Sequence, residues 1–170
     1  TIHLEYLSFN RHRFSQVSVQ PNMIMDVSTD WLTMNDYVNS FNKKYRDRYK
    51  RARRKLNGIK PVEMDEETIK RYSKQLYKLY LNVSNNAKFN TFILTENHFY
   101  SLKIHLKGAF RVFGYFLENE LIGFYTLILN GKHLETYFLG YDAIHQYPNQ
   151  LYLNMLYDMA RFGIENKFET

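Results

Sequence analysis

A run of thirteen residues, 43–55 (KKYRDRYKRARRK), carries the strongest charge of the chain. Nine Lys and Arg with one Asp give it a net charge of +8, whereas the whole chain is +6, so the remaining residues together sum to −2. Cations concentrated on one segment are typical of a surface that binds anions such as nucleic acid, acidic lipid or a phosphorylated substrate. A solvated helix face that keeps the protein in solution is the alternative interpretation.

A second candidate is the junction 141–150, where a predicted strand runs into a predicted helix. The first amides of a helix have no partner within it and the helix dipole is positive there, so such a junction can bind a pyrophosphate. This junction has no glycine-rich loop. Because every strand-to-helix junction offers similar amides, the pattern alone is a weak signal.

Several other kinds of chemistry are excluded. The chain has no Cys, so it offers no thiol nucleophile and no cysteine ligands for zinc or iron–sulfur clusters. His133 and Glu135 form the His-x-Glu of zinc deaminases without the cysteines that those enzymes need. His98 and His105 are seven residues apart but lack a third ligand at a suitable spacing, so we expect no metal. A hydrolase is disfavoured because no Gly-x-Ser-x-Gly motif is present.

Composition indicates a globular protein. The chain has 170 residues, of which 45% are hydrophobic and 24% charged, a length and balance that fit one domain. No apolar run approaches the roughly 20 residues that a membrane helix needs, and residues 1–14 lack the layout of a signal peptide. We therefore expect a cytoplasmic protein without a membrane span. Because residue 1 is not Met and residues 167–170 look like the opening of a strand, we also expect a fragment.

Hydrophobic periodicity predicts the elements in the first two thirds of the chain. Alternation and a Pro-Asn turn predict strands at 17–19 and 23–27. A capping box at Thr33 and an apolar stripe of period 3.6 predict one helix over 34–56. A short strand over 59–64 precedes a helix that Asp65 caps and that ends near Asn82, and a third helix starts near His98.

From Phe110 onward the pattern changes to long apolar runs separated by turn residues. Runs at 110–117, 121–129 and 134–141, with an Asn-Gly turn before the last, predict a three-stranded antiparallel meander. A helix capped by Asn149 should follow and end near Gly163, and a strand starting at Phe168 should lie parallel to the last meander strand. On this helix Tyr157 lies off the apolar stripe, so its hydroxyl can face a site. The predicted fold class is α/β.

This order of elements resembles the GNAT acyltransferase superfamily, and more narrowly its CelD-like and Fem-type branch of peptidoglycan-related aminoacyltransferases. The residues that carry the narrower resemblance are Trp31, Tyr37, Lys44-Tyr45-Arg46, residues 51–55, and Tyr147-Pro148 ahead of Leu151. The resemblance covers residues 14–170. It implies a single GNAT-like domain over 1–170 that lacks its C-terminal strands, with a central, mostly antiparallel sheet, a V-shaped parallel splay and flanking helices.

The resemblance also implies a donor, acetyl-CoA or another acyl-CoA, lying in the splay, and no metal. Backbone groups near Tyr137, Phe138 and Leu139 would pair with the pantetheine, and amides of Asn149, Gln150 and Leu151 would hold the pyrophosphate. GNAT enzymes usually present Gln/Arg-x-x-Gly-x-Gly/Ala at that loop, whereas residues 145–150 read His-Gln-Tyr-Pro-Asn-Gln. Fem-type domains lack that loop too, and some use aminoacyl-tRNA, so both donors remain open.

Acyl transfer to an amine needs a base for the amine and an acid for the leaving group. Glu135 is the expected base because alternation along the strand would place it on the same face as Tyr137 and Leu139. Tyr157 is the expected acid. Lys44, Arg48 and Arg51, which share one flank of the basic helix, are expected to bind phosphates of donor or acceptor.

The resemblance therefore implies a bacterial-type N-acyltransferase acting on a small-molecule or cell-wall-precursor amine. Two alternatives stay open: a nucleic-acid-binding module that uses the helix of residues 43–55, and an inactive GNAT-like binding domain, which the missing glycine loop favours. No sequence feature predicts the oligomeric state.

Overall fold

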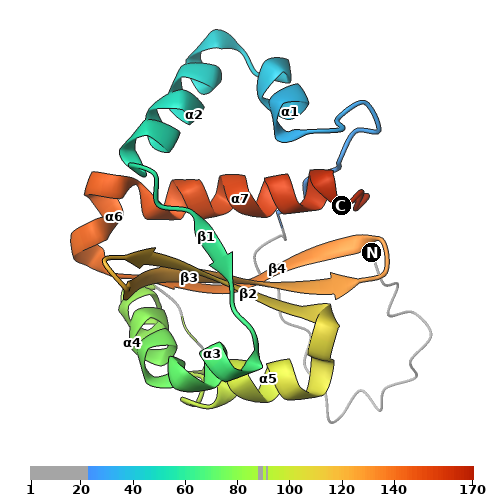
Figure 1. Ribbon diagram of the computed structural model, residues 1–170. Coiled ribbons are helices and arrows are strands. Elements are labelled where there is room, and N and C mark those ends of the chain that lie inside the picture. The colour runs from blue at the N-terminus through green and yellow to red at the C-terminus, as the bar shows by residue number, and fades with distance from the viewer. Residues whose placement is uncertain (1–22, 88–89, 91) are drawn as a thin grey trace, which may run out of the picture.

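A four-stranded antiparallel sheet forms the middle layer of the molecule, with its strands in the order β1–β2–β3–β4 (Figure 1). The computed structural model describes residues 23–87, 90 and 92–170. The strands are β1 (Pro61–Glu63), β2 (Phe110–Leu117), β3 (Glu120–Asn130) and β4 (His133–Tyr141). The predicted meander is confirmed, and the short strand predicted at 59–64 is β1.

Tight turns join the meander strands. Glu118 and Asn119 both have positive φ between β2 and β3, and Gly131 has φ +59° between β3 and β4. Such backbone matches the right-handed twist of the strands, which is why Asn-Gly is a strong hairpin signal. The turn residues thus set the pairing of the whole meander.

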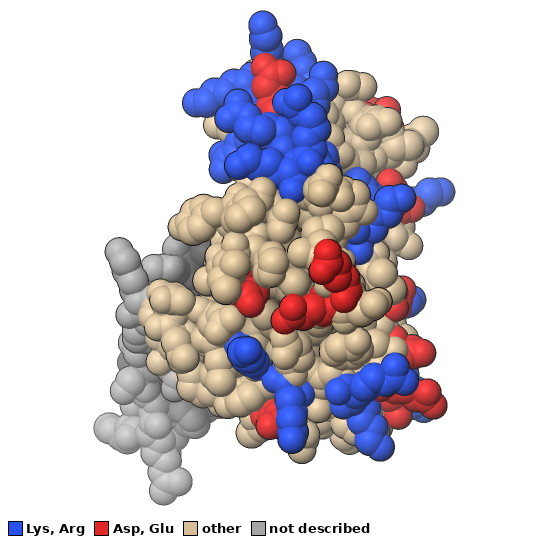
Figure 2. Space-filling view, turned by 60° about the vertical axis from the view of Figure 1, so that its left-hand side comes forward, with Lys and Arg blue, Asp and Glu red and all other residues tan. Residues whose placement is uncertain are grey.

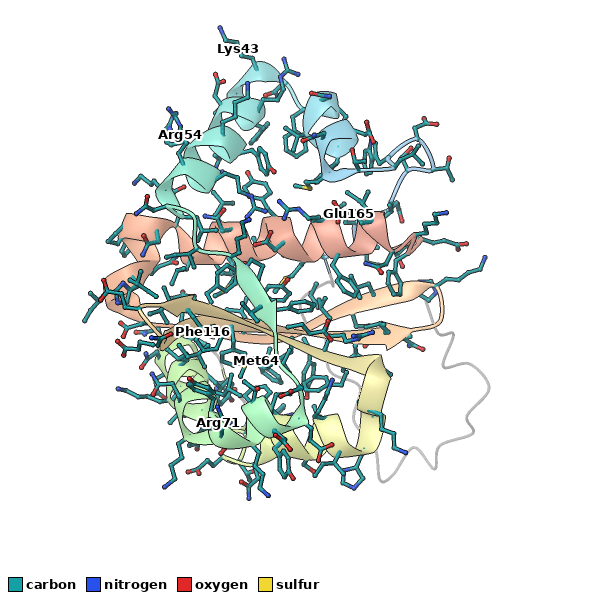
Figure 3. All side chains as sticks on the ribbon, in the orientation of Figure 1. Lys43, Arg54, Met64, Arg71, Phe116 and Glu165 are labelled. Atoms are coloured by element: carbon teal, nitrogen blue, oxygen red, sulfur yellow. The ribbon has the colours of Figure 1, made fainter. Side chains whose placement is uncertain are left out.

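Helices cover both faces of the sheet (Figure 1). On one face lie α3 (Glu66–Arg71), α4 (Ser73–Ser84) and α5 (His98–Leu106), the last followed by a 3₁₀ turn, Lys107–Ala109. On the other face lies α7 (Leu151–Glu165), which α6 (Ala143–Asn149) connects to β4. A further layer, α1 (Met34–Ser40) and α2 (Lys43–Lys55), packs on the side of α7 that faces away from the sheet (Figures 1 and 3).

Three clusters of buried side chains hold these layers together. The first joins the sheet to α3, α4 and α5 through residues such as Leu79, Phe99 and Phe124. The second joins the opposite face to α7, and the third, centred on Met34, Val38 and Ile164, joins α1 to α7. The apolar runs of the meander strands therefore reflect burial on both faces of the sheet.

Two predicted helices are each divided in the structure. The single helix expected over 34–56 ends at Ser40 and starts again at Lys43, because Asn42 caps α2 by accepting a hydrogen bond from the Tyr45 amide (3.2 Å). The helix that Asp65 was expected to cap does start there, but Tyr72 separates it into α3 and α4. Periodicity alone did not reveal these breaks, since the apolar stripe continues through both of them.

Three other expectations need correction or fall outside the description. The strand predicted at 23–27 does not form, although the Val27 amide donates to the carbonyl of Glu169 (2.9 Å). The strand predicted at 17–19 lies outside the described residues. Helix α6 was not predicted because Pro148 lies within it, and Pro is disfavoured in a helix interior. As a result Gln150, not Asn149, precedes α7, in a left-handed conformation.

Gly140 lets α4 approach β4 closely. A Cβ at this position would lie 2.5 Å from the backbone carbon of Leu79 and 2.5 Å from the backbone nitrogen of Tyr80. Backbone atoms inside a helix cannot move aside cheaply. The absence of a side chain at Gly140 therefore sets how close α4 lies to the last strand of the sheet.

A buried ion pair ties α2 to α7 and the sheet. The Arg53 guanidinium donates to both oxygens of Asp158, from Nη2 to Oδ1 (2.5 Å) and from Nη1 to Oδ2 (3.1 Å). The Tyr115 hydroxyl of β2 donates to the same Oδ2 (2.5 Å). Burial lowers the pKa of Arg53, but the hydrogen bonds and charge of Asp158 outweigh that effect and raise it. Asp158 of α7 thus joins three layers, through Arg53 of α2 and Tyr115 of β2.

Gly140→Ala should destabilise the protein, because its methyl group would displace α4. We expect the free energy of unfolding to fall by about 1–3 kcal/mol in urea titrations. Gly108→Ala is the matched control, since a Cβ at Gly108 meets nothing within 4 Å. Equal stability of both variants would contradict the close approach.

Asp158→Asn should lower the free energy of unfolding by about 3–5 kcal/mol, because it leaves the largely buried Arg53 without a counter-charge. The exposed Glu165 lies on the same helix and serves as the control. Glu165→Gln should change the free energy of unfolding by less than about 0.5 kcal/mol. Replacing both charges, in Arg53→Met with Asp158→Leu, should cost less than Asp158→Asn alone. A tolerated Asp158→Asn would show that the pair adds nothing to stability.

Candidate functional site

A β-bulge interrupts β4 near its middle. Thr126 of β3 faces two residues of β4, Tyr137 and Phe138, whereas residues on either side pair one to one. The Thr126 hydroxyl, which is fully buried, donates to the Phe138 carbonyl across the bulge (2.7 Å). Bulges re-aim side chains and are over-represented next to active sites. The bulge lies at the position that the resemblance gave to the pantetheine.

The bulge changes which side chains of β4 share a face. Leu139 packs in the cluster under α7, whereas Glu135 lies opposite Ile128, which packs on the side of α3, α4 and α5. Tyr137 lies on that second side as well, against His98. The expectation that Glu135, Tyr137 and Leu139 share one face is therefore wrong for Leu139, because the extra residue shifts the alternation by one.

The bulge brings Tyr137 to His98, the first residue of α5. The two rings stack with centroids 5.9 Å apart, and His98 Nε2 lies 3.1 Å from the Tyr137 hydroxyl. Phe99 and Phe138 contact the imidazole edge to face. Burial lowers the pKa of His98 and raises the pKa of Tyr137. A neutral imidazole held against a neutral phenol, partly open to solvent, can accept a proton at neutral pH.

The outer edge of β4, the side away from β3, is only partly occupied by the described chain. After α7, the Glu169 amide donates to the carbonyl of Lys132 (2.8 Å) and the Leu134 amide donates to Thr170 (2.8 Å). At the other end the Asn82 side chain donates to the carbonyl of Tyr141 (3.3 Å). Between these points no described residue hydrogen-bonds to this edge. Backbone groups beside the bulge can therefore pair with an extended ligand.

The corner between α6 and α7 offers fewer free amides than expected. The Gln150 amide closes α6 by donating to the carbonyl of Gln146, and the Gln146 side chain accepts from the Tyr152 amide (2.8 Å). Among the described residues nothing accepts from the Leu151 amide, although the Leu151 side chain is fully buried. Of the three residues expected to hold a pyrophosphate, Asn149, Gln150 and Leu151, only the last keeps a free amide at the start of α7.

The expected base and acid lie in different layers. Glu135 is exposed, and its carboxylate accepts a hydrogen bond from the Asn130 side chain (2.8 Å). Tyr157 points away from the sheet into the cluster under α1 and α2, where it meets Tyr49 edge to face at 4.9 Å. Burial raises the pKa of Tyr157. The structure does not bring these two side chains together.

The basic helix α2 divides its cations between structural and exposed roles. Arg53 pairs with Asp158, and the Arg46 guanidinium donates to the carbonyls of Phe41 and Asn39 at the end of α1. The other seven are exposed and, within the described chain, form no ion pair: Lys43, Lys44, Arg48, Lys50, Arg51, Arg54 and Lys55. In Figure 2 they form a basic surface at one end of the molecule.

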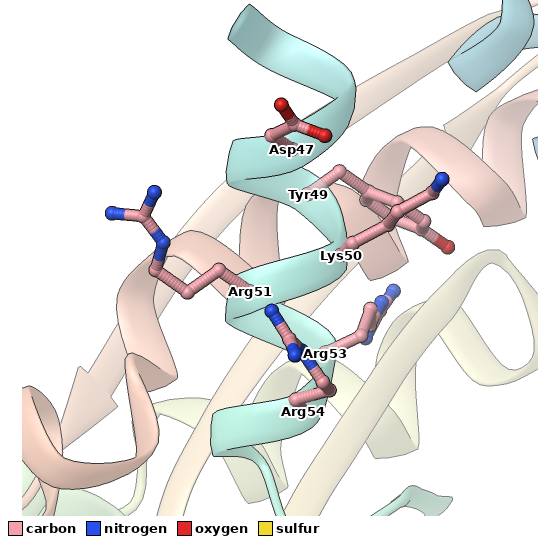
Figure 4. A pocket seen from close by; sticks show the side chains of 6 residues that line it. All are labelled: Asp47, Tyr49, Lys50, Arg51, Arg53 and Arg54. Atoms are coloured by element: carbon pink, nitrogen blue, oxygen red, sulfur yellow. The ribbon is translucent and has the colours of Figure 1, made fainter.

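A hollow of about 730 Å³ lies on this surface (Figure 4). All the residues that line it belong to α2, namely Asp47, Tyr49, Lys50, Arg51, Arg53 and Arg54. Figure 4 shows Arg51 leaving the helix on the opposite side from Tyr49 and Arg53. A hollow built by one helix is a surface feature, not an enclosed small-molecule pocket.

Sequence reasoning missed the importance of His98. The spacing in the sequence relates it to His105 alone, and His105 instead hydrogen-bonds the carbonyl of Ser101 on its own helix (2.7 Å). The described residues hold no group of three side chains that could bind a metal. No described helix combines the length and the apolar character required to cross a membrane.

Comparisons with known proteins give little guidance. No protein-family model matches the chain, and no curated protein matches it significantly. Among solved structures, the chain is similar to an aminoglycoside acetyltransferase from an uncultured soil metagenomic sample, solved in complex with sisomicin. The sequences are 22% identical, the alignment covers 62% of this chain and 73% of that one, and the TM-score is 0.37. A likeness of this size fixes neither the reaction nor the substrate of this chain.

Proposed function

We propose that the chain is an N-acyltransferase whose reaction takes place at the outer edge of β4, beside the bulge. The observation that carries the proposal is the His98–Tyr137 pair, a weakly basic imidazole held at 3.1 Å from a phenol. The pair lies beside a strand edge whose central backbone groups bond to no described residue. The order of elements and the sequence resemblance support the same function. The finer assignments, a V-shaped parallel splay and an acyl-CoA donor, belong to this proposal.

The proposed step is a direct attack on a thioester. His98 takes a proton from the acceptor ammonium group, the amine nitrogen forms a bond to the acyl carbon, and the carbon–sulfur bond breaks. After the attack the nitrogen is positively charged, and its second ammonium proton passes to the leaving thiolate. The products are an amide, a thiol and protonated His98. Tyr137 orients the imidazole, and the exposed carboxylate of Glu135, on the same face, attracts the cationic acceptor.

The donor would lie along the free edge of β4. Its extended amide-containing arm would pair with backbone groups near Tyr137, Phe138 and Leu139. Its pyrophosphate would meet the Leu151 amide, which bonds to no described residue. The Phe138 carbonyl is already used by Thr126, so pairing must use the other groups of this edge. Acetyl-CoA is the simplest donor of this kind, and aminoacyl-tRNA is the alternative.

The proposal predicts that the protein releases CoA from acetyl-CoA when a suitable amine is present. Because the chain has no Cys, a thiol reagent detects only the released CoA. A panel of primary amines, including amino sugars and polyamines, should contain an acceptor. Saturable acetyl-CoA binding by calorimetry should precede this search, and absence of binding to both acetyl-CoA and CoA would contradict the acyl-CoA donor.

His98→Gln should lower turnover by about 10²–10⁴-fold and leave acetyl-CoA binding unchanged. Tyr137→Phe should lower turnover less, since the imidazole remains. Glu135→Gln tests the role first expected for that residue: a loss as large as that of His98→Gln would make the carboxylate the base. Tyr157→Phe is the control, and its turnover should stay at the wild-type level because the side chain lies in another layer.

The lowered pKa of His98 also predicts a pH-dependent stability. The folded protein binds this proton less readily than the unfolded chain, whose imidazole has the ordinary pKa of 6.5. Stability from neutral His98 is therefore fully present above pH 6.5 and is lost as the pH falls through the lower folded pKa. The melting temperature of wild type should fall more between pH 7.5 and 5 than that of His98→Gln. Parallel curves would show that folding does not perturb this imidazole.

A further inference from the structure

We infer that the exposed face of α2 is a binding surface for the phosphodiester backbone of a nucleic acid. The observation that carries this inference is that seven exposed cations on a helix of thirteen residues form no ion pair with a described residue. It is independent of acyl transfer, because α2 lies on the far side of α7 from the sheet (Figure 1).

The cations are confined to one side of the helix. At 100° per residue the seven exposed Lys and Arg span an arc of about 160°, opposite the face that contains Tyr49, Ala52 and Arg53. Four of them form one row along the axis, Lys44, Arg48, Arg51 and Lys55. At 1.5 Å per residue this row is about 16 Å long. A linear row of evenly spaced cations matches the linear charge of a phosphodiester chain.

The geometry leaves these cations available to a ligand. The acid on this helix, Asp47, lies within the arc and makes no ion pair with a described residue. No described carboxylate pairs with a cation of the row. Seven like charges on one helix repel each other, which destabilises the free protein. A role in solubility needs fewer cations and does not need them on one face.

A nucleic acid fits this surface better than an anionic membrane does. A helix that inserts at a membrane surface needs a broad exposed apolar face. On the apolar side of α2 Ala52 is buried, as is Leu56 just after the helix, so Tyr45 alone leaves a large apolar side chain exposed there (47%). Acidic side chains lie on the same face of the molecule as the basic surface (Figure 2). A flat anionic membrane would contact them as well and be repelled. A single polyanionic strand can follow α2 alone.

The test is fluorescence anisotropy of a labelled single-stranded RNA of twenty nucleotides, titrated with the protein between 50 and 300 mM salt. Each phosphate that a cation neutralises on a single strand contributes about −0.7 to the slope of log K, the association constant, against log salt concentration. The row of four cations therefore predicts a slope of about −3. The triple variant Lys44→Ala, Arg48→Ala, Arg51→Ala should lose about tenfold or more in affinity at low salt and reduce the slope by about 2.

A matched control removes the same charge elsewhere. Arg71→Ala, Lys74→Ala, Lys78→Ala takes three exposed cations from α3 and α4 and should bind RNA as wild type does. Equal losses in both triple variants would overturn the inference, as would absence of RNA binding at 50 mM salt. Vesicles with anionic lipid form the second arm. If they bind more tightly than RNA and depend on the α2 row, the partner is a membrane and the inference is wrong.

Discussion

The position of α2 depends on one carboxylate. Asp158 is almost fully buried, and it receives Arg53 from α2 and Tyr115 from β2, so it connects the outer helices, α7 and the sheet. Asn154, one turn earlier on α7, adds a bond from its amide to the carbonyl of Ala52 (3.0 Å). Apart from these contacts α2 buries little, because Ala52 is the one residue within it that is fully enclosed. A buried charge pair is a weak source of net stability but a strict geometric constraint. The ion pair therefore fixes where a highly charged helix sits, and thereby which of its cations face solvent.

The strand that carries the candidate site depends on a different constraint, the register of the β3–β4 pairing. At the bulge one residue of β3 lies opposite two residues of β4. As a result Tyr137 points toward α5, while Leu139 packs in the cluster under α7. Gly140 then allows α4 to press against the strand just beyond the bulge. The imidazole of His98 reaches Tyr137 because α5 begins on this same side of the sheet. The candidate site thus results from pairing and close packing rather than from a local motif.

These two constraints explain how much of the molecule could be predicted from its sequence. The meander was predictable because its apolar runs and its Asn-Gly turn are local signals, and the cap at Asp65 was predictable for the same reason. Arg53 could not be told from the eight other cations of its run, because its partner lies 105 residues away. The bulge could not be predicted either. The sequence of β4 shows no break in its pattern, and the extra residue appears only in the pairing with β3. His98 looked isolated because its partner belongs to a strand far along the chain.

The two candidate surfaces make opposite demands on the fold. A basic surface needs unpaired charges, and contacts beneath the helix must offset their mutual repulsion. Arg53 supplies such a contact by lying over the Tyr49 ring, and Tyr49 in turn packs edge to face against Tyr157. A site for acyl transfer needs a weakly basic group, which partial burial of His98 among aromatic rings supplies. Strong positive potential beside the site would disfavour a cationic acceptor. Separation of the basic helix from the sheet by the full thickness of α7 meets both demands, and this separation is the arrangement that the buried Asp158 maintains.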